Sequence, residues 1–206
     1  MKSIQFCALI LLLSACGSDL LKPQGDISRS FKALDQDLIL VDIGNLNISS
    51  SEISGSGAFV VNDPLAGVDS EAHFKIDAVL NEGALVEFIV FSSAALEDGI
   101  SFAFRRADNL VSLKITNLFR QASWSDTIRL QDDNRVSFSL DVHNQEQPAH
   151  FILWDGLLAG RRMPDLIDSA EDDLNLGNGR GAFWGVRLEN ATLLQISREQ
   201  AVKSHD

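Results

Sequence analysis

Side chains that could take part in chemistry gather in one short stretch of the chain, between Ser139 and Gly156. Histidine, carboxylate and amide groups at this spacing can hydrogen-bond a ligand, coordinate a metal ion or transfer a proton. A tryptophan near the end of the stretch adds an aromatic surface of the kind that lines ligand sites. The candidate ligand-binding residues are Asp141, His143, Asn144, Glu146, His150, Trp154 and Asp155.

Three interpretations of this stretch stay open from the residues alone. A metal site is one, although the stretch has no recognised ligand spacing such as His-Glu-x-x-His. Acid/base catalysis is another, which needs two carboxylates at a set separation and has Asp141 and Glu146 as its candidates. The third is a polar strand face followed by turn residues that hydrogen-bond the backbone.

A second polar cluster lies between residues 165 and 178. Hard oxygen ligands on a flexible loop suit calcium, and the metal candidates are Asp168, Asp172, Asp173 and Asn175. The spacing fails the EF-hand pattern, because Gly177 stands where a third ligand should be. Calcium is therefore the one cofactor that the sequence suggests, and a solvated acidic loop is the other interpretation.

The elements that must position these groups are β-strands, because apolar residues recur with a period of two from Leu38 onward. In 135–143 the even residues are apolar and the odd ones are polar, so Asp141 and His143 share one strand face. If the chain returns through His150, the polar groups gather near one end of a sheet. The sequence does not determine the register, so His150 lies either beside His143 or on the opposite face.

Turn signals divide the alternating stretches into a series of short strands with no long amphipathic helix between them. We predict one hairpin across 100–115 and another across 128–142. The stretch 85–91 is apolar on both faces apart from Glu87, which is typical of a central strand covered from both sides. The sequence therefore predicts an all-β fold, an antiparallel β-sandwich.

The order of these strands resembles the concanavalin A-like lectin/glucanase jelly roll, and within it the laminin G-like branch. The landmarks are Trp154-Asp155-Gly156, which ends a strand, and Phe183-Trp184-Gly185, which begins a last long strand. Laminin G-like domains often carry calcium, so the resemblance also implies that ion. Two patterns of related enzymes are absent from the chain: the Glu-x-Asp-x-x-Glu run of the glucanases and the Gln-Ile-His strand of the alginate lyases.

The N-terminus resembles the leader of a bacterial lipoprotein. The apolar stretch 7–13 is too short to cross a bilayer, and it leads into Leu13-Ser14-Ala15-Cys16, which resembles the lipobox. The resemblance implies cleavage before Cys16, acylation of that cysteine and attachment to a lipid bilayer. It also implies the outer membrane of the cell envelope, because Gly17 replaces the aspartate that retains such proteins at the inner membrane. We expect a signal peptide over 1–15, a lipidated tether over 16–36 and a single β-sandwich domain over 37–206.

Charge limits the partners of this chain. Its formal net charge of −12 argues against a nucleic-acid partner, since the phosphate backbone would be repelled. The favoured hypothesis is a non-enzymatic, membrane-anchored module that binds a glycan, the cell wall or an envelope protein. The alternative is a divergent carbohydrate-active enzyme, a hydrolase or lyase, that uses Asp141, His143 and Glu146.

Overall fold

A computed structural model describes residues 38–63, 65, 71–129, 134–144, 149–157, 165–169, 172 and 174–200. The expected signal peptide and tether, with Cys16, lie outside the described residues, and so do Glu146 and Asp173. Within the described ranges, no helix is long and apolar enough to cross a membrane.

The regular elements of the described chain are ten β-strands, and each pairs antiparallel with its neighbours. They are β1 (Leu38–Ile48), β2 (Ile53–Val61), β3 (Glu71–Ser92), β4 (Ile100–Ala107), β5 (Leu110–Asn117), β6 (Ala122–Arg129), β7 (Arg135–His143), β8 (His150–Asp155), β9 (Asp165–Asp168) and β10 (Phe183–Gln200).

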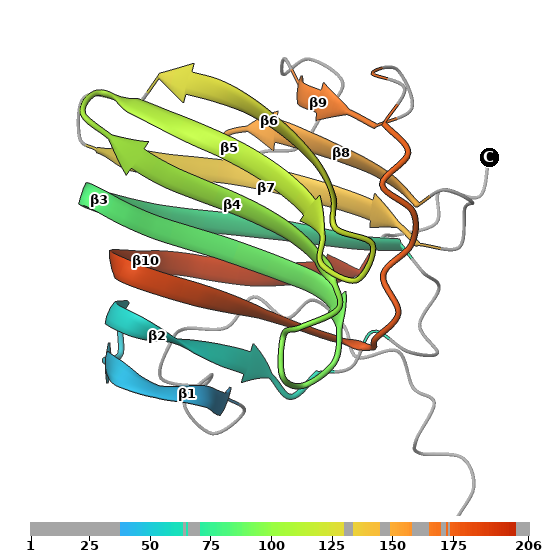
Figure 1. The fold of residues 1–206 in the computed structure, drawn as a ribbon. Coiled ribbons are helices and arrows are strands. Elements are labelled where there is room, and N and C mark those ends of the chain that lie inside the picture. The colour runs from blue at the N-terminus through green and yellow to red at the C-terminus, as the bar shows by residue number, and fades with distance from the viewer. Residues whose placement is uncertain are drawn as a thin grey trace, which may run out of the picture.

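Two long strands, β3 and β10, pair along their whole length and bend together from one layer of the molecule to the other (Figure 1). Residues 85–90 of β3 pair with β4, whereas residues 71–79 pair with β7. At the bend Gly83 has a φ of 73° and Asn190 a φ of 51°, conformations that glycine and asparagine adopt most easily. A front layer therefore holds β4, β5 and β6 with the second half of β3, and a back layer holds β7, β8 and β9 with the first half.

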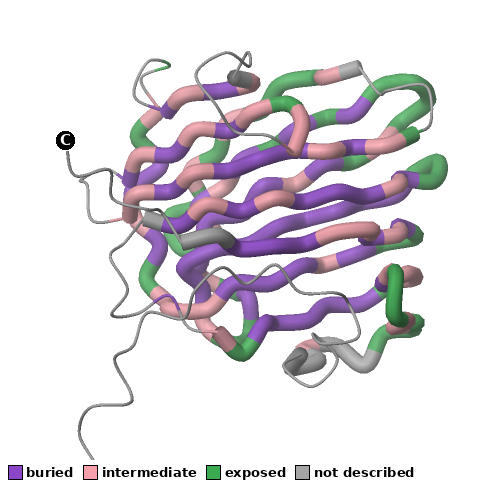
Figure 2. Tube along the Cα trace, turned by 180° about the vertical axis from the view of Figure 1, so that it is seen from behind, coloured by how far each residue is buried: buried purple, intermediate pink, exposed green. Residues whose placement is uncertain are grey.

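The two layers enclose one large apolar core. Phe74, Phe88 and Trp184 contact one another there, with ring centroids 4.9, 5.2 and 6.2 Å apart. Figure 2 shows how buried positions alternate with partly exposed ones along the strands, as the period of two predicts. Burial of one such large apolar side chain contributes about 1.5–3 kcal/mol to folding. The predicted antiparallel β-sandwich is confirmed.

The second half of β3 is buried on both of its faces, as the apolar stretch 85–91 predicts. Phe88 points into the main core, and Ile89 points outward into a small second cluster with Val60 of β2. Leu96, from the loop between β3 and β4, covers this cluster and is itself buried. The loop therefore covers the outer face where β2, β10 and β3 lie side by side near their ends.

The predicted hairpin across 100–115 is confirmed by the pairing of β4 with β5, but the hairpin across 128–142 is wrong. In the described chain β6 pairs with β5, whereas β7 pairs with β3 and β8 in the other layer. The layers of a sandwich lie about 10 Å apart, and five residues span up to about 17 Å. A connection of this length can therefore cross between layers as easily as it can close a hairpin.

Candidate functional site

The β7–β8 hairpin determines where most of the candidate side chains point. His143 pairs with His150, and Asp141 pairs with Ile152, so these four residues share the outer face of the back layer. The two imidazole rings lie stacked, with centroids 5.6 Å apart and an angle of 24° between their planes. The observed register therefore places His150 beside His143, a choice that the sequence alone did not determine. We call this outer surface the back face.

Two histidine–carboxylate pairs lie on the back face, and one of them includes the stacked ring of His150. The Nδ1 atom of His73, on β3, contacts the carboxylate of Asp141. The Nε2 atom of His150 lies 2.9 Å from Oδ1 of Asp168, on β9. All four side chains are largely buried, with exposed fractions from 13% for His73 to 32% for Asp141. Four neighbouring strands thus hold these polar groups in fixed positions.

The back face continues along β3 and β7 as a second network. Asp77 is only 2% exposed, and its carboxylate accepts hydrogen bonds from the guanidinium of Arg135 and, at 2.8 Å, from the hydroxyl of Ser137. Ser139 is fully buried and donates to the carbonyl of Gly156 at 2.8 Å. These donors compensate the buried charge of Asp77, and removal of one of them would be costly, so this part of the face is structural.

Trp154 and Asp155 lie on opposite sides of β8. Trp154 pairs with Ser139 and is half-buried on the back face, two positions from Ile152. Asp155 pairs with Phe138, a core residue, so it lies on the inner side of the sheet and is exposed at the strand end. The structure therefore brings Trp154 to the side of Asp141 and His150, and places Asp155 apart from them.

Asn144 connects the two layers at the end of the sandwich. Its side-chain amide pairs twice with the backbone of Gly179, donating to the carbonyl at 3.2 Å and accepting from the N–H at 3.1 Å. Asn178 donates to the carbonyl of Asn144 at 2.6 Å and accepts from the Asn117 amide at 3.1 Å. Asn144 was a candidate ligand contact, but both ends of its amide hold the 174–181 segment in place.

The metal candidates are only partly brought together. Asp168 turns its carboxylate to His150, and its N–H donates to Asp172 at 3.1 Å. Asn175 is exposed, and Asp173 lies outside the described residues. In the ranges that the structure describes, no three His, Cys, Asp or Glu side chains gather as they would around a metal ion. Calcium binding by this loop stays a prediction.

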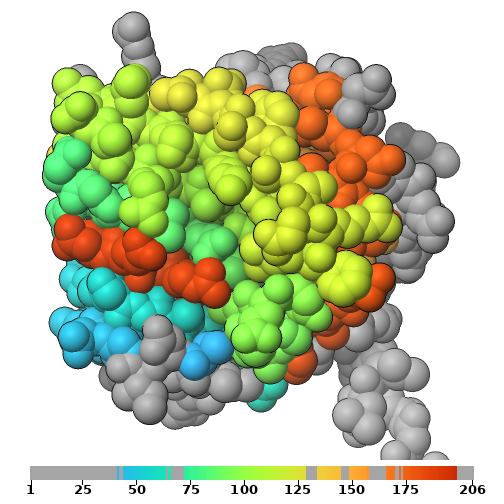
Figure 3. Space-filling model, viewed as in Figure 1, coloured from blue at the N-terminus to red at the C-terminus, as the bar shows by residue number. Residues whose placement is uncertain are grey.

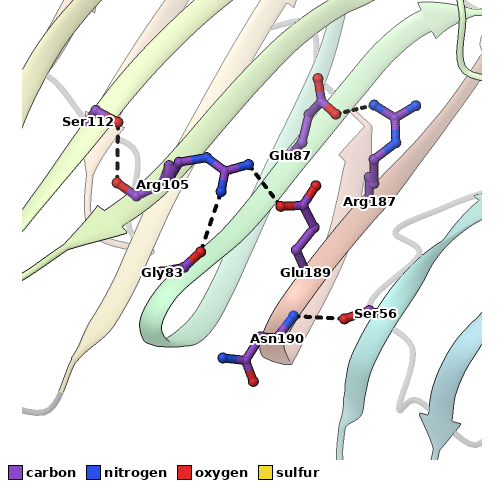
Figure 4. Close-up of polar contacts among 8 residues, drawn as sticks. All are labelled: Ser56, Gly83, Glu87, Arg105, Ser112, Arg187, Glu189 and Asn190. Carbon is purple, nitrogen blue, oxygen red and sulfur yellow. Dashed lines mark hydrogen bonds and ion pairs between the residues drawn. The ribbon is translucent and has the colours of Figure 1, made fainter.

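The outer surface of the front layer, which faces the viewer in Figure 3, carries polar residues that no sequence pattern singled out as a site. Glu87 of β3 is buried there and accepts a hydrogen bond from Ser101 at 2.5 Å and another from Arg187. Arg105 donates to Glu189 at 2.8 Å beside this network (Figure 4). The one signal in the sequence was Glu87 itself, a charged residue within an otherwise apolar strand.

Five carboxylates on the two outer faces share one feature: each contacts a specific cationic or imidazole group. The five are Asp77, Asp141, Asp168, Glu87 and Glu189. Catalysis of glycoside cleavage uses a pair of carboxyl groups that face the substrate from opposite sides. The arrangement seen here instead suits a rigid hydrogen-bonding surface.

Comparisons with known proteins agree with this architecture. No model of a protein family matches the chain, and no curated protein matches it. Among solved structures, the chain is similar to the exoplasmic/lumenal domain of VIP36 in its Ca²⁺/Man3GlcNAc-bound form. The two are 10% identical, and the match covers 90% of this chain and 92% of that chain with a TM-score of 0.51.

Two further solved structures have lower TM-scores. The carbohydrate-binding module CBM66 from Bacillus subtilis is 14% identical, with 79% of this chain and 95% of that one covered and a TM-score of 0.48. A β-1,3-1,4-glucanase (lichenase) derived from a mouse hindgut metagenome is 9% identical, with 86% and 100% covered and a TM-score of 0.47. At such identities the likeness is one of fold: the chain is an all-β antiparallel sandwich that resembles the concanavalin A-like lectins and glucanases.

Proposed function

We propose that the protein is a non-enzymatic binding module of the bacterial cell envelope, anchored by lipid at Cys16, and that its ligand is a glycan. The main support for the proposed binding site is the row formed by His143, His150 and Asp168 on the back face. Strand pairing and the 2.9 Å contact between His150 and Asp168 fix these groups before any ligand arrives. A preorganised polar surface loses little conformational entropy on binding, which favours affinity.

Two further observations support a glycan over an envelope protein. Trp154 lies on the same face as the histidines, and an aromatic ring beside hydrogen-bonding groups suits the mixed polar and apolar surface of a sugar. The VIP36 domain, which shares the fold, binds the saccharide Man3GlcNAc. The laminin G-like relationship and a calcium ion in the 165–178 loop belong to the same proposal, and neither is needed for the row of histidines to bind.

A divergent glycan hydrolase or lyase is the alternative. Its predicted acid/base pair, Asp141 and Glu146, has one member outside the described residues, and the other contacts His73. Five carboxylates of the outer faces are held in pairs of this kind, which supports a binding role over a catalytic one.

Oligosaccharide binding by the full chain, extracted in mild detergent, tests the proposal. An array of neutral and acidic oligosaccharides should retain the protein, and His150→Ala should weaken that binding by about tenfold, because it removes the stacked ring and one partner of Asp168. His150→Gln keeps a donor for Asp168 and should bind more tightly than His150→Ala. Asp108→Asn, in the exposed β4–β5 turn, is the matched control.

Two results would count against the proposal. The first is retention by none of the arrayed saccharides, and the second is equal binding by His150→Ala and the control. New reducing ends in a bound saccharide after incubation would favour the enzymatic alternative.

A further inference from the structure

Two of the described arginines differ from those that form an ion pair with a carboxylate. The described arginine side chains that contact a carboxylate are Arg105, Arg106, Arg135, Arg187 and Arg198. Arg120 and Arg180 are both exposed, and within the described residues neither guanidinium contacts a carboxylate. Exposed cations often lack an ion pair, so it is the packing of these two guanidinium groups against an aromatic ring and a glycine that sets them apart. Their positions therefore suggest a role outside the fold itself.

The guanidinium of Arg180 lies over an exposed aromatic ring. Its Cζ atom is 3.5 Å from the centroid of Phe119, in the turn between β5 and β6. Phe119 is still 51% exposed with the guanidinium on it, the most exposed large apolar side chain of the described chain. A guanidinium stacked on a ring keeps its N–H donors at its edge, where a planar anion can accept two of them.

The Arg120 guanidinium packs against a glycine of the neighbouring segment. Gly177 has a φ of 78°, and a Cβ atom at this position would come within 2.4–2.8 Å of the Arg120 guanidinium. The missing side chain lets the guanidinium lie directly over the backbone of residue 177. The 118–121 turn and the 174–182 segment lie at the same end of the sandwich (Figure 1), and together they bring two cations and one aromatic ring there.

The frame under these three residues is rigid. The Asn117 side chain is fully buried, and its Oδ1 accepts from the N–H groups of Phe119 and Arg120 at 3.1 and 3.0 Å. Its amide donates to the carbonyl of Asn178 at 3.1 Å, which ties the turn to the segment that carries Arg180. The backbone donors of the turn are thus already used, and a ligand would meet side chains.

We propose that Phe119, Arg120 and Arg180 form a second site, the rim patch, that binds the carboxylate of an acidic saccharide. Two guanidinium groups provide charge-assisted hydrogen bonds to the carboxylate, and the ring of Phe119 packs against the C–H face of the sugar. An extended acidic peptide would use free backbone donors or an apolar groove, and the turn donates its N–H groups internally. The rim patch is separate from the back face and rests on the proposed function only in taking the ligand to be a glycan.

Tetragalacturonate is the probe, because each of its sugars carries one carboxylate. Calorimetry at low salt should show binding to the full chain, and the fully methyl-esterified tetramer should bind at least tenfold more weakly. Arg120→Gln and Arg180→Gln should each weaken binding of the acid by about tenfold. Arg105→Gln is the matched control, since it removes the same charge from an exposed arginine that already pairs with Glu189.

A further variant keeps the charge and alters only its position. Gly177→Ala retains both arginines but displaces the Arg120 guanidinium, so it should also weaken tetragalacturonate binding. Equal losses in Arg105→Gln would show general electrostatics and overturn the rim patch, as would equal binding of tetraglutamate. If the rim-patch variants bind tetragalacturonate as the wild type does while neutral glycans still bind, the rim patch is refuted and the proposed function stands. If no saccharide binds the protein at all, both proposals are refuted.

Discussion

Single residues of the back face show where sequence reasoning succeeds and where it stops. Asp141, His143 and His150 were predicted to gather because one hairpin contains them, and pairing within a hairpin is local. His73 was not predicted, since it reaches Asp141 through the pairing of β3 with β7, 68 residues away in sequence. A slip of one residue in that pairing would move every side chain to the other face, and no local pattern specifies it.

A residue outside the candidate sites, Asp98, gives the chain a defined response to acid. Burial raises the pKa of Asp98, but hydrogen bonds from the N–H of Ser93 at 2.5 Å and the hydroxyl of Ser92 at 3.2 Å outweigh it, so the pKa is lower than usual. A carboxyl group with a lowered pKa stabilises the folded state above the ordinary aspartate pKa of about 3.9, and this contribution is lost as the pH falls through the folded value.

Asp98→Asn should therefore be less stable than the wild type near neutral pH, and the difference should shrink as the pH falls below about 4. Urea unfolding at several pH values measures it, with Asp108→Asn as the exposed control. A difference in unfolding free energy that stays constant down to about pH 3 would contradict the role assigned to the Asp98 carboxylate.

For the strands, the residue pattern within one strand predicted that strand and its buried face, but beyond local hairpins the sequence did not predict which strands pair with one another. The alternation in β4, β5 and β7 identified the strands and their buried faces, and the run 85–91 identified a strand covered on both sides. The crossing between β6 and β7 was missed, because a polar turn looks the same whether it closes a hairpin or changes layer. The joint bend of β3 and β10 was also missed, since it depends on pairing between segments far apart in sequence.

The segment that leads into β10 lies against the end of β3 so closely that only glycine fits at position 181. A Cβ atom there would come within 1.9 Å of the backbone carbon and oxygen of Ser92, and the Gly181 N–H donates to the carbonyl of Phe91 at 2.8 Å. Backbone atoms cannot move aside as a flexible side chain can. Gly181→Ala should therefore lower the unfolding free energy by about 1–3 kcal/mol or more.

Gly83→Ala is the control for that change. Gly83 has a φ of 73°, but a Cβ atom added to it would meet no other atom within 4 Å, so the cost should be limited to backbone strain of about 1 kcal/mol. Urea unfolding of both variants compares the two costs. Equal losses would show that the contact with Ser92 relaxes without effect and that only glycine flexibility matters.

For the molecule as a whole, the distribution of its charges separates its two proposed binding surfaces. On the back face Asp77, Asp141 and Asp168 pair with arginine or histidine, whereas the rim patch carries two arginines with no carboxylate partner in the described chain. Asn144, Asn178 and Gly179 join the two regions at one end of the sandwich. A single chain of polar contacts thus fixes both surfaces relative to the core.

Attachment to the bilayer is the remaining proposal for the whole molecule, and it depends on the thiol of Cys16. Lasting attachment needs more than one acyl chain, because a single chain binds a bilayer only marginally. Cys16→Ser removes the acyl acceptor, so the variant should incorporate no radioactive palmitate and should keep the signal peptide over 1–15. Cys7→Ser is the matched control, because Cys7 lies in the stretch expected to be removed and its loss should leave labelling and processing unchanged. Palmitate labelling of Cys16→Ser at the wild-type level would refute the lipobox, whereas loss of labelling in Cys16→Ser alone would assign the anchor to that cysteine.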